Sequence, residues 1–128
     1  FTFGLDSTGA LHVYVPKSSS AMHVATGTGS ILSGQWVQVA FTWDGTVGTA
    51  AAAHVYVNGV EQTKAVAVDG SGTLSYANAT NKSFRIGNNS YLTTVGSLNG
   101  KVAYLAVYRG RVLTGTELNQ LDGQLPIR

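Results

Sequence analysis

The fold is decided by two neighbouring stretches, Gly34-Gln35-Trp36-Val37-Gln38-Val39-Ala40-Phe41-Thr42-Trp43-Asp44-Gly45 and Ala53-His54-Val55-Tyr56-Val57-Asn58-Gly59. Apolar and smaller or polar residues alternate in the first stretch, which predicts a strand over 36–43 with one face on the core. Val39 lies on that face, so Val39→Asp is expected to prevent folding. The second stretch ends in Asn58-Gly59, a strong hairpin signal because both turn residues accept positive φ.

Composition indicates one domain, spanning residues 1–128, with room for one core. Charged residues make up only 11% of the chain, against about 25% in ordinary soluble domains. This low charge, with many Gly, Ser and Thr residues, favours a secreted, cell-surface or virion protein over a cytosolic enzyme. The chain starts at Phe1 without an initiator or targeting segment, so we expect it to be part of a longer protein.

Several classes of partner and site are not expected. The net charge is +2 and the basic residues are scattered, apart from Tyr108-Arg109-Gly110-Arg111, so no nucleic-acid interface is predicted. No apolar run approaches the roughly 20 residues of a membrane span. The chain has no cysteine, which excludes disulfides and cysteine-based metal sites.

Further short strands are predicted around the two decisive stretches. They comprise a hairpin over 1–5 and 11–15, a short strand over 22–25, a hairpin return arm over 60–68, a strand over 84–87 and a long strand over 98–108. Near-continuous apolar character predicts that the last strand is buried on both faces. One helix is predicted at about 115–122, opened by a Thr114–Glu117 capping box and a Leu113–Leu118 staple, and ended by Gly123. Many short strands with one small helix are typical of an antiparallel sandwich.

Five motifs follow one another in a recognisable order: residues 34–40, 55–59, 84–87, 98–102 and 112–118. In this order the chain resembles the concanavalin A-like lectin/glucanase superfamily, in its laminin-G-like branch. The resemblance implies an all-β fold, a jelly roll of two antiparallel sheets. Members usually have strands ahead of the position of Phe1. Either the domain is therefore a compact variant, or a neighbouring chain or segment covers the edge that those strands would occupy.

Catalysis is not expected. Glucanases of this superfamily use closely spaced carboxylates on one strand, and two side chains on one strand face must lie two residues apart. The acidic residues are Asp6, Asp44, Glu61, Asp69, Glu117 and Asp122, and no two have that spacing. We therefore predict no catalytic residue.

Carbohydrate binding needs an aromatic face for the sugar ring and polar groups for its hydroxyls. Asn88, Asn89 and Tyr91 supply this chemistry on one predicted loop. Tyr14, His54 and Tyr56 lie on strand faces opposite their core neighbours and are expected to line a concave groove. The alternative, that these residues only form turns or pack, stays open.

No cofactor is expected to be required, but the resemblance leaves calcium as an alternative, held by carboxylates and carbonyls at the loop rim. Asp44 and Asp69, with Asn88 and Asn89, are the available donors. The three histidines, His12, His23 and His54, are not spaced as metal ligands. They alternate with core residues, which predicts side chains that face solvent or a groove.

The leading hypothesis is a non-catalytic recognition module, carbohydrate-binding or adhesive, within a larger secreted, surface or virion protein. The alternative is a structural or assembly subunit, such as a virion decoration or filament component, that uses the sandwich as a rigid unit.

Overall fold

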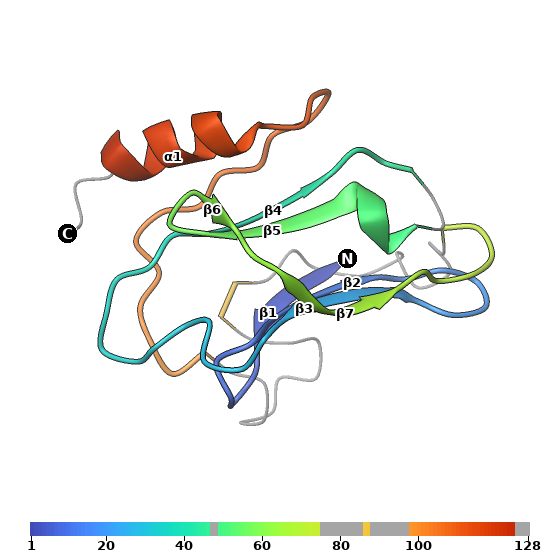
Figure 1. The fold of residues 1–128 in the computed structure, drawn as a ribbon, viewed down its shortest axis with the longest axis horizontal. Helices are drawn as coiled ribbons and strands as arrows, with labels where there is room; N and C mark the ends of the chain where they lie inside the picture. The colour runs from blue at the N-terminus through green and yellow to red at the C-terminus, as the bar shows by residue number, and fades with distance from the viewer. Residues whose placement is uncertain (47–48, 75–85, 88–97, 125–128) are drawn as a thin grey trace.

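The computed structural model describes residues 1–46, 49–74, 86–87 and 98–124, and it places their strands in two antiparallel sheets (Figure 1). The first sheet has the order β1-β2-β3-β7, formed by Thr2–Leu5, Leu11–Val15, Met22–Thr26 and Lys64–Val68. The second has the order β4-β5-β6, formed by Val39–Trp43, Ala53–Val57 and Val60–Glu61. A short 3-10 helix, η1 (Ala50–Ala52), precedes β5, and α1 (Gly115–Gln124) follows near the C-terminus. The predicted all-β, two-sheet antiparallel sandwich with one short C-terminal helix is confirmed.

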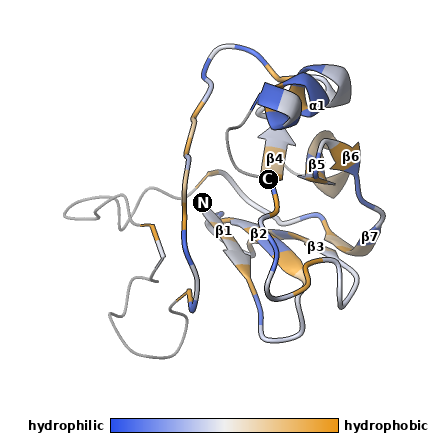
Figure 2. Cartoon of the chain, turned by 90° about the vertical axis from the view of Figure 1, so that its left-hand side faces the viewer, coloured by the Kyte–Doolittle hydropathy of each residue, from blue (hydrophilic) through white to orange (hydrophobic). Residues whose placement is uncertain are grey.

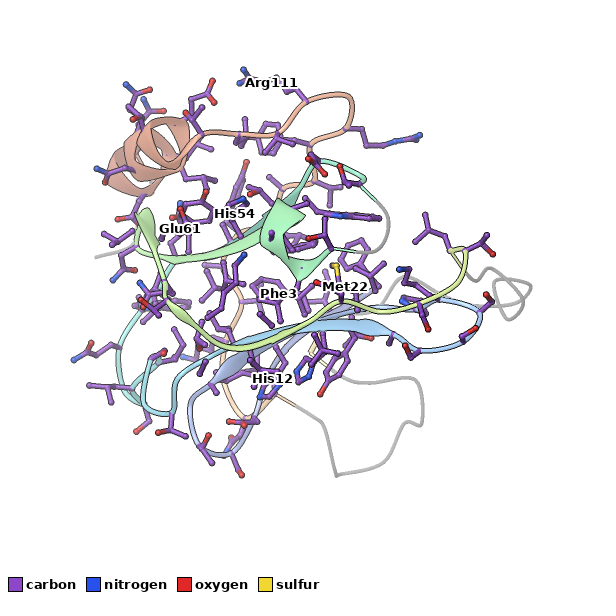
Figure 3. The ribbon with its side chains drawn as sticks, turned by 45° about the vertical axis from the view of Figure 1, so that its right-hand side comes forward. Phe3, His12, Met22, His54, Glu61 and Arg111 are labelled. Carbon is purple, nitrogen blue, oxygen red and sulfur yellow. The ribbon has the colours of Figure 1, made fainter. Side chains whose placement is uncertain are left out.

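The core lies between the two sheets. Strand β2 shows why: Leu11, Val13 and Val15 are buried, whereas His12 and Tyr14 point to the opposite face. Figure 3 shows Phe3 and Met22 between the layers. The main cluster takes residues from both sheets and from η1: Leu11, Val13, Val15, Met22, Val24, Ala50, Ala53 and Val55. These small and β-branched side chains fill the space between two pleated surfaces.

Strand β4 is shorter and more exposed than its sequence predicts. It begins at Val39 rather than Trp36, and Val39 is 39% exposed. Phe41 and Trp43 pack against the main core, but Thr42, on the opposite face, is also buried. Among the described strands, β4 pairs only with β5, so no described strand lies along its other edge. The first residues of the alternating run are exposed for this reason.

The Asn58-Gly59 hairpin forms as predicted, with φ of 49° at Asn58 and 73° at Gly59. Its return arm, however, is not one strand. Val60–Glu61 completes the second sheet as β6, and the chain then crosses to the first sheet, where Lys64–Val68 forms β7 beside β3. The segment predicted as a single strand thus connects the two layers.

Helix α1 covers the outer face of the second sheet (Figure 1). The predicted capping box is present: the Thr114 backbone N–H donates to Glu117 Oε2 at 2.8 Å, and the Glu117 N–H donates to Thr114 Oγ1 at 3.3 Å. Leu113 and Leu118 pack together with Tyr56 in a second apolar cluster. Gly123 does not end the helix, because it is not in the left-handed conformation and α1 continues to Gln124. None of the helices in the described ranges is long and apolar enough to cross a membrane.

The predicted long strand over 98–108 is wrong for this structure. Residues 98–112 are all exposed and none is in a strand, including Val102, Leu105 and Val107. Figure 2 shows this partly apolar segment running outside both sheets. A buried strand needs neighbours on its hydrogen-bonding edges. Among residues 98–112, and counting only partners in the described part of the chain, the Leu98 N–H alone donates to a distant backbone oxygen, that of Gly87. The predicted strand over 84–87 lies partly outside the described residues; Ile86 and Gly87 form a bend.

Candidate functional site

Four side chains form a connected surface on the outer face of the first sheet: Asp6, His12, Tyr14 and His23, here called the Tyr14–histidine face. His12 and Tyr14 alternate with the buried residues of β2, so they point away from the core. Tyr14 lies directly opposite His23 on β3, and His12 is the diagonal neighbour of His23. The expectation that His12 and His23 face away from the core is confirmed.

Asp6 sits in the turn between β1 and β2 and is held there by the turn itself. Its Oδ1 accepts hydrogen bonds from the Thr8 N–H at 2.8 Å, the Thr8 hydroxyl at 2.7 Å and the Ala10 N–H at 3.0 Å. These bonds, led by that of the Thr8 side chain, hold the pKa of the Asp6 carboxyl well below its usual range. Asp6 is therefore an anion of fixed orientation, with Oδ2 directed to a different partner.

That partner is His12, which links Asp6 to His23. His12 Nε2 lies 3.0 Å from Asp6 Oδ2, and His12 Nδ1 lies 3.0 Å from His23 Nε2. Partial burial, followed by the nearby charge of His12, lowers the pKa of His23. His23 therefore favours the neutral imidazole, which can accept or donate one hydrogen bond through either ring nitrogen.

Tyr14 completes the face as its most exposed aromatic ring. Its ring stacks on His23, with centroids 4.1 Å apart and planes 9° from parallel. Tyr14 is nevertheless 40% exposed. The face therefore offers an aromatic surface beside carboxylate and imidazole groups, on strands whose positions are fixed by the core.

The predicted groove of Tyr14, His54 and Tyr56 does not form. Figure 3 shows His12, of the Tyr14–histidine face, and His54 on opposite outer sides of the sandwich. Tyr56 is only 7% exposed and packs with Leu113 and Leu118 beneath α1. The sequence places Tyr56 correctly on the face opposite the main core, but α1 covers that face. His54 stays near the surface, where its Nδ1 lies 2.6 Å from Glu61 Oε1.

The two predicted calcium donors, Asp44 and Asp69, both accept hydrogen bonds from backbone N–H groups. Asp44 Oδ1 accepts from the Thr46 N–H at 2.7 Å, and this bond is the main reason that the pKa of Asp44 is lowered. Asp69 Oδ1 accepts from the Ala50 N–H at 2.7 Å, which ties the end of β7 to η1. Within the described part of the chain, no three His, Cys, Asp or Glu residues gather as a metal-binding group.

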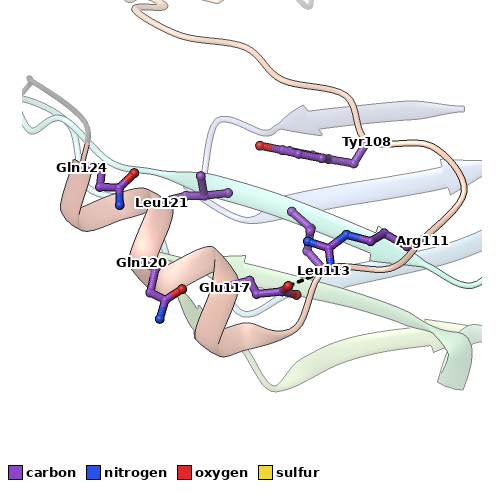
Figure 4. A pocket seen from close by; sticks show the side chains of 7 residues that line it. All are labelled: Tyr108, Arg111, Leu113, Glu117, Gln120, Leu121 and Gln124. Atoms are coloured by element: carbon purple, nitrogen blue, oxygen red, sulfur yellow. Dashed lines mark ion pairs between the residues drawn. The ribbon is translucent and has the colours of Figure 1, made fainter.

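A second polar surface lies between α1 and the segment that leads to it (Figure 4). It is an open pocket of about 260 Å³ lined by Tyr108, Arg111, Leu113, Glu117, Gln120, Leu121 and Gln124. Arg111 Nη1 pairs with Glu117 Oε1 at 2.8 Å, which fixes one wall. Sequence reasoning did not select this pocket. The other predicted loop site, Asn88, Asn89 and Tyr91, lies outside the described residues and stays a prediction.

The convergence of Asp6, His12 and His23 was also missed. Part of the signal was present, because period-two alternation places His12 and Tyr14 on one face and Asp6-Ser7-Thr8-Gly9 is a turn sequence. The register that brings His23 opposite Tyr14 depends on how β3 pairs with β2, and no local motif encodes it.

The carboxylates whose contacts are described have structural partners. Asp6 and Glu61 pair with histidines, Glu117 caps α1 and pairs with Arg111, and Asp44 and Asp69 hold loops. None of these contacts places two carboxylates across one surface as a general acid and a nucleophile require. The absence of a catalytic residue stays a prediction.

Comparison with known proteins gives one finding on family. Residues 1–119 match the family model Laminin_G_3, described as the concanavalin A-like lectin/glucanases superfamily. Neither the search of curated proteins nor the search of solved structures gave a match. The matched region includes both sheets and the first half of α1, in agreement with the sandwich described above. The chain therefore belongs to the concanavalin A-like lectin/glucanase superfamily, as a domain of laminin G type.

Proposed function

We propose that this domain is a non-catalytic recognition module that binds carbohydrate through the Tyr14–histidine face. The observation that carries the proposal is the exposed Tyr14 ring, stacked on His23 and flanked by His12 and Asp6. Aromatic rings contact the C–H surface of a sugar, and carboxylate and imidazole groups bond its hydroxyls. The family supports this role, since lectins give the superfamily part of its name.

The geometry favours binding because the polar groups are already held in place. Asp6 is fixed by three hydrogen bonds from its own turn, and His12 is held between Asp6 and His23. A ligand that contacts this face therefore orders few side chains, which reduces the entropic cost of binding. We further propose that the module acts in a larger secreted, cell-surface or virion protein and needs no cofactor.

A glycan array probed with the labelled chain tests the proposal, in buffer with and without a chelator of divalent cations. We expect binding to a defined set of glycans, unchanged by the chelator. Tyr14→Ala should weaken it about two- to tenfold, since a lost aromatic contact costs about 0.5–1.5 kcal/mol. Tyr108→Ala, in the pocket beside α1, is the matched control and should bind as the unmodified chain does.

Two results would contradict the proposal: no glycan bound above background, or equal binding by Tyr14→Ala and the unmodified chain. Tyr91→Ala provides a separate arm for the predicted loop site with Asn88 and Asn89. If Tyr91→Ala abolishes binding and Tyr14→Ala does not, the loop rather than the sheet face carries recognition. A signal that is lost with chelator and restored by added Ca²⁺ would instead favour the calcium alternative, with Asp44 or Asp69 as donors.

A second function, as an assembly subunit, is favoured by the exposed apolar segment over 102–112. Val102, Leu105 and Val107 are half exposed or more, and β4 has no second neighbour among the described strands. Exposed apolar residues and an unpaired strand edge are each typical of association surfaces. Sedimentation velocity tests the assembly function. Oligomers whose size depends on concentration, at micromolar concentrations of the chain, favour assembly, and a stable monomer counts against it.

A further inference from the structure

His12 and His23 meet nitrogen to nitrogen on the outer face of the first sheet. Their Nδ1 and Nε2 atoms are 3.0 Å apart, the ring planes differ by 12°, and the ring centroids are 5.2 Å apart. A short nitrogen separation with well-separated centroids means that the rings meet edge to edge rather than face to face. His12 Nδ1 and His23 Nε2 therefore both point into the gap between the two rings.

Asp6 determines which nitrogen of His12 is free. Its Oδ1 accepts three hydrogen bonds from the turn, and its Oδ2 lies 3.0 Å from His12 Nε2. A carboxylate oxygen accepts, so Nε2 carries the hydrogen and donates it. In the neutral imidazole, Nδ1 then presents its lone pair to His23. Histidines that bind metal ions are oriented in this way, with the second ring nitrogen donating to a carboxylate.

The nitrogen spacing also fits a metal ion. Two imidazole nitrogens bound tetrahedrally at about 2.0–2.1 Å lie about 3.3 Å apart, a few tenths of an ångström more than the 3.0 Å observed. Both histidines are partly exposed at the sheet surface, so small side-chain rotations can supply the difference. In the absence of metal, a hydrogen bond donated by His23 Nε2 to His12 Nδ1 takes the place of the ion.

We propose that His12 and His23 form a two-histidine site for a divalent transition-metal ion, with Asp6 as a positioning residue. Imidazole nitrogens select Cu²⁺, Ni²⁺ and Zn²⁺ and disfavour Ca²⁺ and Mg²⁺, which require oxygen ligands. The described part of the chain brings no third ligand to this pair. Water or an external ligand would complete the coordination that these described residues leave open.

This inference goes beyond the proposed recognition function and does not depend on it, because the metal ion alone is the probe. It also differs from the calcium alternative at Asp44 and Asp69, which concerns oxygen donors at the loops. The glycan array in chelator tests recognition without metal, whereas titration with metal alone tests this site without glycan.

Isothermal titration calorimetry on the chain, treated with chelator and free of a histidine tag, tests the proposal. We expect one ion per chain, with Cu²⁺ bound more tightly than Ni²⁺ or Zn²⁺, and no heat of binding for Ca²⁺. His12→Gln and His23→Gln should each weaken Zn²⁺ binding by at least about tenfold, and Asp6→Asn by about tenfold. The matched control is His54→Gln, whose histidine also pairs with a carboxylate and whose loss should change nothing.

Nuclear magnetic resonance of the imidazole nitrogens gives a second readout that does not depend on a variant. Zn²⁺ should shift the resonances of His12 Nδ1 and His23 Nε2 and leave those of His54 in place. The proposal is overturned if no saturable binding occurs, if His12→Gln and His23→Gln bind Zn²⁺ as the unmodified chain does, or if the shifts fall on His54.

Discussion

Replacing Tyr56 by alanine distinguishes a packing role beneath α1 from a role in ligand binding. The sequence predicts that Tyr56 lines a ligand groove, whereas the structure buries it to 7% exposure beneath α1, against Leu113 and Leu118. An isolated ten-residue helix is marginal in water, so α1 depends on this apolar contact for its position. Tyr56→Ala should therefore weaken the fold rather than a binding surface.

The expected loss is about 3–5 kcal/mol of unfolding free energy, the range for truncating a buried aromatic side chain to alanine. For a chain of this length each kcal/mol shifts the melting temperature by about 4 °C, so the melting temperature should fall by more than about 10 °C. Tyr14→Ala is the matched control. Tyr14 is 40% exposed, so its loss should cost about 1 kcal/mol or less, mainly from the stack on His23.

Both free energies can be measured by urea denaturation followed by tryptophan fluorescence, with circular dichroism as a check on helix content. The reasoning is refuted if Tyr56→Ala is no more destabilising than Tyr14→Ala. It would also fail if Tyr56→Ala left stability intact and removed glycan binding, since that result would return Tyr56 to the ligand surface.

Three further predictions test the fold, and two of them compare a pair of substitutions. Gly59→Ala should lower the free energy of unfolding by about 2 kcal/mol or more, because φ is positive and the new Cβ would lie 2.5 Å from the backbone of α1. Gly34→Ala, also at positive φ but in open space, should lower it less when both variants are unfolded with urea. Val55→Asp should abolish the folding transition, since Val55 is fully buried, whereas Val39→Asp should leave a measurable transition because Val39 is 39% exposed. The lowered pKa of Glu117, caused first by the Thr114 N–H bond, predicts a contribution to stability that is present above pH 4.5 and lost as the pH falls through the folded-state pKa. Glu117→Gln should flatten the pH dependence of the melting temperature below pH 4.5, and an unchanged profile would contradict that assignment.

The local elements could be predicted from sequence because their causes are local. Alternation in 11–15, the turn at Asn58-Gly59 and the Thr114–Glu117 cap each depend on residues a few positions apart, and all three are present. The order of five motifs then identified the superfamily, which the family comparison confirms.

The errors arose where pairing between distant segments decides the outcome. The apolar run over 98–108 has strand-like composition, but burial depends on neighbouring strands that its own sequence does not specify. Val39 and Tyr56 were assigned to the correct faces of their strands. The exposure of Val39, however, depends on β4 having β5 as its sole neighbour among the described strands, and that of Tyr56 depends on α1.

The candidate site was the least predictable part. Tyr14 was selected from its strand position, but its partners Asp6, His12 and His23 converge only through the β2–β3 register and the turn between β1 and β2. Asn88, Asn89 and Tyr91, selected from loop composition, remain a prediction.

The central claim is that the domain recognises carbohydrate through the Tyr14–histidine face. Its most direct test is a titration of the isotope-labelled chain, by nuclear magnetic resonance, with a glycan that the array identifies. We predict saturable shifts concentrated at Tyr14, His12, His23 and adjacent residues of β2 and β3. Shifts confined to the pocket beside α1 or to the surface around His54, or no shifts at all, would contradict the claim.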